Sequence, residues 1–265
     1  MGETSRAHLC AEALRCAGTR PFTTNYRLRL YEFKIEIVPG KKEDLMFVIK
    51  ERVNRCSQDL IEMFKKVEPA TLGHVLHEGF MDHTLRCLVK GAKVVGPAVT
   101  VKTAGADSTV VHKAMEVAQK GDVVVVDRCG DMRHACWGGV VTLAASLRGV
   151  AGGIVDGLVT DGEEIEKVGF SLYCKGITAL TTKLLGYGGE INTVIQCGGV
   201  VVKPGDLIVA DSNGILVLDP EVAKPLGEKA LSMQEREKDL IARLEKGEFL
   251  PKITAADSLI LGKSK

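Results

Sequence analysis

Short β-rich runs alternate with helical segments through the middle of the chain, and this alternation restricts the possible folds more than any other feature. Runs of β-branched, apolar residues predict strands over 94–101, 123–126 and 153–155. Helical spacing of apolar residues predicts helices over 109–120, 140–148 and 163–168. Strands that alternate with helices pair in parallel, because each helix carries the chain back across the sheet. The sequence therefore predicts an α/β fold.

The flanking segments follow other patterns. Apolar residues recur at helical spacing from Leu45 to Phe64, which predicts one long helix that Pro69 ends. Thr71 can cap a shorter helix that reaches His77. Beyond residue 171 the chain is mostly strand, with strands expected over 172–174, 194–197, 200–202, 207–210 and 215–218. A last helix is expected from about 220 to 246.

The length of 265 residues is enough for one large domain or two small ones. Because residues 1–40 have little periodicity, we expect an N-terminal extension there, a single domain over 41–250 and a tail over 251–265. The longest uncharged stretch covers about 14 residues, which is too short to span a bilayer.

Charge and cysteine spacing exclude several classes of protein. The formal net charge of +1 argues against a general attraction to nucleic acid or to anionic membranes. The eight cysteines form no C-x-x-C pair, which argues against a zinc ribbon or a thioredoxin-type site. No secretory signal precedes them, so we expect reduced thiols and a cytoplasmic protein.

The usual nucleotide and hydrolase motifs are absent. The sequence has no G-x-G-x-x-G after a strand and no complete P-loop, so it lacks the glycines that hold phosphates in those sites. It also has no G-x-S-x-G and no H-E-x-x-H.

Two neighbouring segments carry the candidate chemistry. Gly138-Gly139 comes just before a predicted helix, where the first backbone amides have no partner within the helix and can receive an anion. Asp161, Glu163 and Glu164 follow the next strand, and their oxygens suit Mg²⁺ or Mn²⁺. Ligands bind beyond the carboxyl ends of strands in open α/β sheets. Together these residues predict an anion cradle beside a divalent-cation site, which can hold a 2-oxo acid.

Each segment also has a purely structural interpretation. Asp161 and Glu164 fit a capping box, with Asp161 as the N-cap and Glu164 at the third helical position. Gly138-Gly139 can serve only to let a strand and a helix pack closely. The spacing alone leaves both interpretations open.

Residues 92–219 resemble a known family, the regulator of ribonuclease activity A-like proteins, which include metal-dependent 4-hydroxy-4-methyl-2-oxoglutarate aldolases. The resemblance rests on six sequence pieces, which are Gly96-Pro97-Ala98-Val99-Thr100, Gly121 to Asp127, Trp137-Gly138-Gly139, Gly149 to Gly157, Gly198-Gly199-Val200 and Pro204-Gly205-Asp206. It implies a swivelling β/β/α domain, with a central mixed β-sandwich or barrel flanked by helices. It also implies trimers or hexamers with active sites between subunits, and metal-dependent lyase chemistry on 2-oxo acids, including decarboxylation of oxaloacetate to pyruvate.

The resemblance also assigns residues. The family's signature is Gly or Asp, twenty residues, Arg-Asp, two residues and then Glu or Asp; here Gly139 is followed by twenty residues, Thr160-Asp161, two residues and Glu164. It implies that Asp161 ligates Mg²⁺ or Mn²⁺, and that Asp161, Glu164 and a neighbouring subunit's Glu237 are catalytic. The substrate would be bound by Thr160 and by the backbone amides of Gly138, Gly139, Val140 and Val141.

One position departs from the family pattern. Thr160 stands where the family has Arg, and threonine cannot make the paired, charge-assisted hydrogen bonds that arginine makes to a carboxylate. Arg133, Arg148 or Lys183 could supply the missing cation. The alternative function is a non-catalytic regulator that binds a ribonuclease or another protein, as the family's namesake does.

Overall fold

The computed structural model describes residues 47–262. The predicted extension over residues 1–40 lies outside that range, as does the beginning of the predicted domain. None of the helices within 47–262 is long and apolar enough to cross a membrane.

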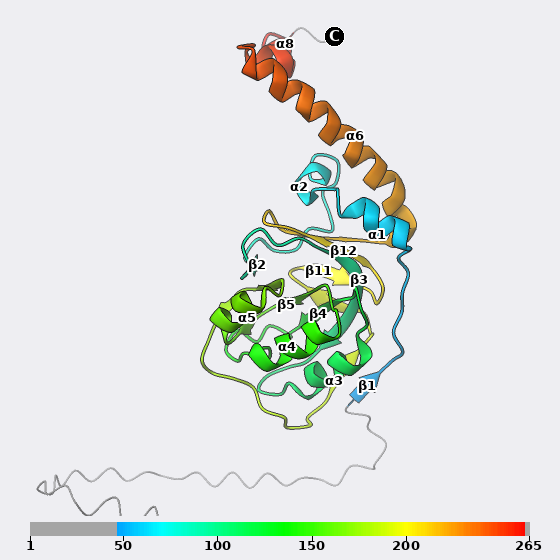
Figure 1. Cartoon of the computed structure of the whole chain (residues 1–265), viewed down its shortest axis with the longest axis vertical. Helices are drawn as coiled ribbons and strands as arrows, with labels where there is room; N and C mark the ends of the chain where they lie inside the picture. The colour runs from blue at the N-terminus through cyan, green and yellow to red at the C-terminus, as the bar shows by residue number, and fades with distance from the viewer. Residues whose placement is uncertain (1–46, 263–265) are drawn as a thin grey trace, which may run out of the picture. The chain divides into compact units, whose positions relative to one another are not determined.

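A large mixed β-sheet forms the centre of the described chain (Figure 1). Its parallel core is formed by β3 (Val94–Lys102), β4 (Val123–Asp127), β5 (Gly152–Val155) and β7 (Leu172–Cys174). The outer strands are β1 (Phe47–Ile49) and β9 (Gly189–Ile191) on one side and β2 (Arg86–Cys87) on the other. The first half of β3 also pairs antiparallel with β12 (Leu207–Ala210), which pairs with β13 (Ile215–Leu218). The predicted α/β class is confirmed, with a mixed sheet.

Strand β4 shows why the sheet centre is so apolar. Val124 and Val126 face the apolar core under α3 (Thr109–Val117), α4 (Gly139–Leu147) and α5 (Gly162–Val168). Val123 and Val125 face a second core, which includes β13 and the hairpin of β10 (Ile195–Cys197) and β11 (Val200–Val202). All four valines are fully buried, as expected for a strand covered on both faces.

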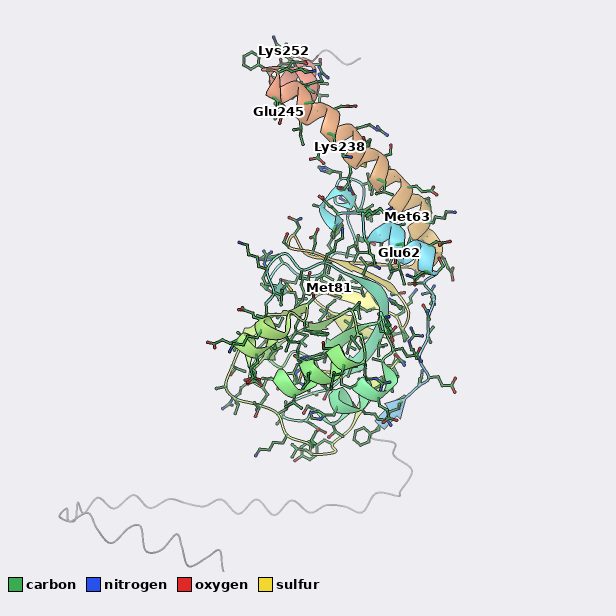
Figure 2. The ribbon with its side chains drawn as sticks, in the orientation of Figure 1. Glu62, Met63, Met81, Lys238, Glu245 and Lys252 are labelled. Carbon is green, nitrogen blue, oxygen red and sulfur yellow. The ribbon has the colours of Figure 1, made fainter. Side chains whose placement is uncertain are left out.

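A third apolar core joins a long helix near the end of the chain to the sheet. It lies among α1 (Gln58–Phe64), α2 (Pro69–Leu72), α6 (Pro220–Glu245) and the β12–β13 hairpin, with Phe64, Leu72 and Leu216 fully buried. Figure 2 shows Met63 of α1 beside α6. Two short helices follow, α7 (Leu250–Ile253) and α8 (Ala256–Ile260).

The predicted helix from Leu45 to Phe64 is wrong over most of its length. Residues 47–49 form strand β1, which pairs in parallel with β9, and the helix begins only at Gln58. Ser57 caps it, because its hydroxyl accepts a hydrogen bond from the Leu60 amide at 3.2 Å. Strand pairing therefore overrides the helical spacing.

The predicted cap at Thr71 is also wrong. Helix α2 begins at Pro69, with Glu68 as its N-cap, and Thr71 is buried inside it. The other predicted helices and strands are found with ends shifted by at most three residues. The sequence analysis missed β9 and the two-residue strands β2, β6 (Leu158–Val159) and β8 (Gly176–Ile177), which are too short to show a period.

Candidate functional site

Buried Trp137 anchors the loop that leads to Gly138-Gly139. The Trp137 ring stacks on Phe170 with centroids 6.0 Å apart, and its indole nitrogen donates to the Thr142 hydroxyl at 2.9 Å. Helix α4 then begins at Gly139, with Gly138 as its N-cap. The first turn of α4 is thereby fixed to the apolar core.

The loop before Trp137 is held by a carboxylate turn. Asp131 accepts hydrogen bonds from the backbone amides of Arg133 and His134 at 2.8 and 2.9 Å, and one from the His134 ring at 2.9 Å. Burial favours the neutral acid, but these bonds and buried Arg128 outweigh it and lower the pKa of Asp131 to about 2. The loop therefore carries a carboxylate that stays ionised at neutral pH.

Asp161 lies against the first turn of α4. The Thr160 amide donates to the Trp137 carbonyl at 2.9 Å, which joins the two segments. Asp161 Oδ2 accepts a hydrogen bond from the Gly139 amide at 2.9 Å, and Oδ1 accepts one from the Thr160 hydroxyl at 3.2 Å. Gly139 and Asp161 are therefore in direct contact, although they are 22 residues apart in the sequence.

The capping-box interpretation is wrong. Asp161 is the N-cap of α5 by position, but its side chain makes no cap hydrogen bond to that helix. Its backbone is left-handed, with φ of 57°, a conformation that costs a non-glycine residue energy and that clusters at functional sites. The side chain caps α4 instead, so the amide of Gly139 is already paired.

The double glycine leaves room for two carboxylates. A Cβ at residue 138 would lie 2.6 Å from Asp161 Oδ2, and a Cβ at residue 139 would overlap Glu164 Oε2 and lie 3.5 Å from Asp161 Oδ2. Asp161 and Glu164 are exposed, so both carboxylates lie beside solvent next to Gly139. Any other residue here would push the two acids away.

This donor set fits a hard divalent cation. Mg²⁺ is usually bound by one or two carboxylates and keeps several waters, which is what Asp161 and Glu164 offer. Among residues 47–262 no group of three or more His, Cys, Asp or Glu converges, so the remaining ligands would come from water, substrate or another subunit. The amides of Val140 and Val141 have no acceptor within the described residues and remain available to an anion.

A shallow hollow of about 340 Å³ adjoins this pair. Gly139 and Glu164 line it together with Val140, Leu143, Lys167 and Val168. Lys167 is the one cation in this lining. The sequence analysis missed it, although it lies one helical turn beyond Glu164 on the same helix.

Other predicted residues lie elsewhere. Glu237 is exposed on α6 and lines a different hollow with His74 and Met233, so a single chain does not bring it to Asp161. Arg148 donates to the carbonyls of Ala118 and Glu116 at the end of α3 and is not free to replace the family's arginine. Arg133 and Lys183 are exposed and line no part of the hollow beside Glu164.

Comparison with known proteins places the chain in a family. The family model described as "RraA-like: Aldolase/RraA" matches residues 68–217, which include both glycines and both acids. The chain belongs to the RraA-like family.

Several relatives of this RraA-like chain have names that refer to aldolases. A Halalkalibacterium halodurans protein named "Putative 4-hydroxy-4-methyl-2-oxoglutarate aldolase" is 36% identical over 188 residues, which are 70% of this chain and 86% of that protein. An Arabidopsis thaliana protein with the same type of name is 34% identical over 128 residues, 48% of this chain and 76% of that protein.

The solved structures agree in fold. Streptomyces coelicolor RraAS2, described as an unusual member of the RNase ES inhibitor RraA protein family, superposes with a TM-score of 0.63 at 27% identity and covers 71% of this chain and 97% of its own. A Pseudomonas syringae protein superposes with a TM-score of 0.66 at 20% identity, covering 78% and 97% of the two chains. The family thus includes proteins described as aldolases and as ribonuclease inhibitors.

Proposed function

We propose that this chain is a divalent-metal-dependent carbon–carbon lyase that acts on 2-oxo acids. The observation that carries the proposal is the pair of exposed carboxylates, Asp161 and Glu164, beside a double glycine at which an added Cβ would displace one or the other of them. The relatives named as 4-hydroxy-4-methyl-2-oxoglutarate aldolases make that compound the first substrate to test, with oxaloacetate second.

Each residue of the candidate site has a role in this proposal. Asp161 and Glu164 hold Mg²⁺ or Mn²⁺, which when bound supplies the Lewis acidity that stabilises negative charge as a carbon–carbon bond breaks. The free amides of Val140 and Val141 orient the substrate carboxylate at the positive end of α4. Thr160 keeps the Asp161 carboxylate in place through its hydroxyl and can offer the substrate only a neutral contact.

The proposal includes a homo-oligomer, a trimer or hexamer. Helix α4 exposes Val140, Leu143 and Leu147 on one face, with 79%, 51% and 79% of their surface accessible. Apolar stripes of this kind mark contact surfaces, and this one adjoins the site. A neighbouring copy packed here would bring Glu237 to the site, where its carboxylate would accept the proton of the substrate's 4-hydroxyl group as the carbon–carbon bond breaks and return it to the carbon that becomes the methyl group of pyruvate.

Pyruvate release tests the proposal directly. Lactate dehydrogenase and NADH report pyruvate formed from either substrate with Mg²⁺, with Mn²⁺ and with EDTA. We expect metal-dependent turnover that falls at least about 100-fold in Asp161→Asn, which keeps the side-chain size but loses the charge. Glu166→Gln on the exposed side of the same helix is the matched control, and it keeps wild-type turnover.

Metal binding gives a readout that does not depend on the choice of substrate. Titration of Mn²⁺ followed by electron paramagnetic resonance should show a site in the wild-type protein and in Glu166→Gln that is lost in Asp161→Asn. Turnover or Mn²⁺ binding that is indifferent to this substitution would contradict the proposed site.

A second candidate function is a protein-binding regulator. Thr160 in place of the family's arginine favours it, because the site lacks the cation that would hold a substrate carboxylate. The similarity to a protein of the RNase ES inhibitor family points the same way. If the wild-type protein and Asp161→Asn inhibit purified RNase ES equally well, that result would support the regulatory function over the lyase.

A further inference from the structure

A second hollow, distant in sequence from the proposed lyase residues, lies where the parallel strands begin. It has a volume of about 480 Å³ and shares no lining residue with the hollow beside Glu164. Val95 and Pro97 of β3 line it, together with Gly121 just before β4 and Ala151 just before β5. It therefore lies at the amino ends of these strands, whereas α4 and α5 follow the carboxyl ends.

Arg52 forms a fixed part of its wall. The guanidinium donates two hydrogen bonds to Asp122, Nε to Oδ2 at 2.6 Å and Nη2 to Oδ1 at 2.5 Å. The Asp122 side chain is fully buried and also accepts from the Gln119 amide at 2.8 Å. Arginine carries five N–H donors, and the three that remain on Arg52 have no acceptor within the described residues. They are oriented donors without a partner.

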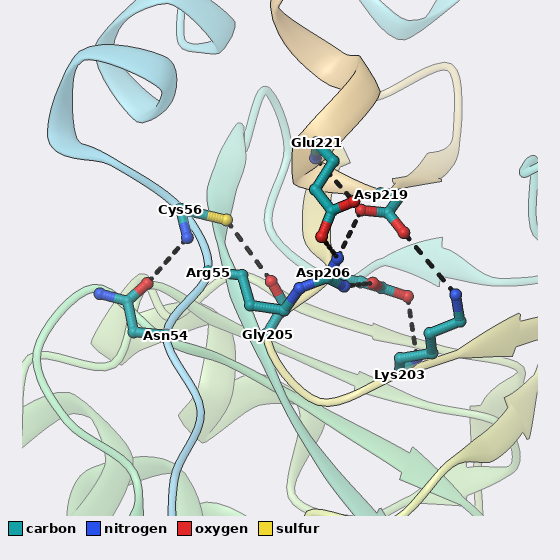
Figure 3. A network of polar contacts seen from close by, with 8 residues as sticks. All are labelled: Asn54, Arg55, Cys56, Lys203, Gly205, Asp206, Asp219 and Glu221. Carbon is teal, nitrogen blue, oxygen red and sulfur yellow. Dashed lines mark hydrogen bonds and ion pairs between the residues drawn. The ribbon is translucent and has the colours of Figure 1, made fainter.

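The segment that carries Arg52 is held on its other side by a second arginine. Figure 3 shows Arg55 between three acids: Asp206 at 3.0 Å, Asp219 at 2.6 Å and Glu221 at 3.2 Å. In the same view, Asn54 accepts from the Cys56 amide, and the Cys56 thiol points to the Gly205 carbonyl. Contacts within the chain itself therefore hold the segment that forms this wall in place.

The charged lining is entirely cationic. Arg52, Lys65 and Lys120 line the hollow, and no carboxylate does. The charge of Asp122 is matched by Arg52, and Lys65 pairs with Glu62 at 2.7 Å in an exposed contact that contributes little. Lys120 makes no ion pair with any residue of 47–262. An excess of positive charge remains.

We propose that this hollow binds a small organic anion, with a phosphate or carboxylate group at Arg52 and Lys120. A guanidinium with free N–H donors matches either group geometrically, and the volume lies in the range of small-molecule sites. Apolar Ile61, Val95 and Pro97 pack against the rest of the ligand. This site is independent of the proposed lyase site.

Isothermal titration with two probes tests the proposal. Phenyl phosphate and benzoate are titrated into the full chain, with chloride at matched ionic strength as the reference. We expect saturable binding of at least one probe, weakened at least about 10-fold by Lys120→Glu. Lys229→Glu, which makes the same charge change on the exposed side of α6, should bind as the wild-type protein does.

The choice of variant keeps the result interpretable. Arg52 is left in place, because its removal would leave the Asp122 carboxylate buried without a partner and could unfold the protein. Binding of phenyl phosphate alone assigns a phosphate ester, and binding of benzoate alone assigns a carboxylate. No saturable binding of either probe, or equal affinity in Lys120→Glu and Lys229→Glu, overturns the proposal. Pyruvate release that persists in Lys120→Glu shows that the two sites are separate.

Discussion

At the scale of single residues, three unusual features of the candidate site explain one another. The left-handed backbone of Asp161 costs of order 1–3 kcal/mol and needs compensation from its surroundings. That conformation turns the carboxylate away from its own helix and toward the Gly139 amide. The approach depends on Gly138, because a Cβ there would lie 2.6 Å from Asp161 Oδ2. The strained backbone of Asp161 thus places its carboxylate against the first turn of α4.

Thr160 provides a test at this scale in which activity should rise. Thr160→Arg restores the family's residue beside Asp161 and adds charge-assisted hydrogen bonds to the substrate carboxylate. Such a contact is worth about 1.5–3 kcal/mol, so kcat/KM for pyruvate release should rise roughly 10- to 100-fold. Asn213→Arg, in the exposed β12–β13 turn, adds the same charge elsewhere and should change nothing. An unchanged kcat/KM in Thr160→Arg would show that this position does not contact the substrate.

At the scale of elements, one buried acid ties a loop to α3. Asp107, only 1% exposed, accepts hydrogen bonds from the Thr109 amide and hydroxyl at 2.9 and 2.6 Å. It also accepts from the amides of Leu185 and Tyr187 at 3.2 and 2.7 Å. Burial opposes ionisation, but these four donors outweigh it and lower the pKa of Asp107 to about 2.

The pH dependence of stability follows from that shift. The folded-state pKa lies below the ordinary value of 3.8, so the ionised form favours folding. Its contribution, roughly 2 kcal/mol, is complete above about pH 4 and is lost as pH falls through about 2. We expect Asp107→Asn to lower the free energy of unfolding by about this amount at pH 7. Between pH 4 and pH 2 its stability should also fall less than that of the wild-type protein.

Urea unfolding at several pH values measures both effects. Asp59→Asn is the control, because Asp59 is exposed on α1 and makes no side-chain hydrogen bond within the described residues. Parallel stability curves for the wild-type protein and Asp107→Asn would contradict this account.

The contact between α1 and α6 predicts that replacing a glycine by alanine lowers stability, whereas helix propensity alone would predict an increase. Gly227 is buried in α6, and a Cβ there would lie 2.6 Å from Met63 Sδ and 2.9 Å from the Phe64 ring. Alanine favours a helix by about 1 kcal/mol over glycine, but overpacking a core costs about 1–3 kcal/mol. Gly227→Ala should therefore lower the melting temperature, while Lys229→Ala on the exposed side leaves it nearly unchanged. A higher melting temperature for Gly227→Ala would mean that α6 can move away from α1.

These elements show how far the sequence alone could lead. The strands β3, β4 and β5 and the helices between them could be predicted, because each carries its own period. The start of α1 could not, because pairing of β1 with β9 joins segments about 140 residues apart. For the site, the sequence could point to Gly139 and Asp161. It could not give the hydrogen bond between them, which depends on how Trp137 positions both segments.

At the scale of the whole molecule, one chain does not assemble every residue of the proposed lyase site. Asp161 and Glu164 lie together beside α4, whereas Glu237 lines a separate hollow on α6. The exposed apolar stripe of α4 lies next to the two acids. A closed ring of copies that buries this stripe would join the two halves of the site at each contact between subunits.

Mixing two inactive variants tests that arrangement. Asp161→Asn and Glu237→Gln are each expected to release little pyruvate, because every site in either homo-oligomer lacks one acid. When the two chains are co-expressed and assemble at random, about a quarter of the sites combine an intact Asp161 with an intact Glu237 from the neighbour. Activity should then return to roughly a quarter of the wild-type value, and light scattering should show one oligomer. If both acids of a site came from one chain, no mixed oligomer would recover activity, and the proposed role of Glu237 would be wrong.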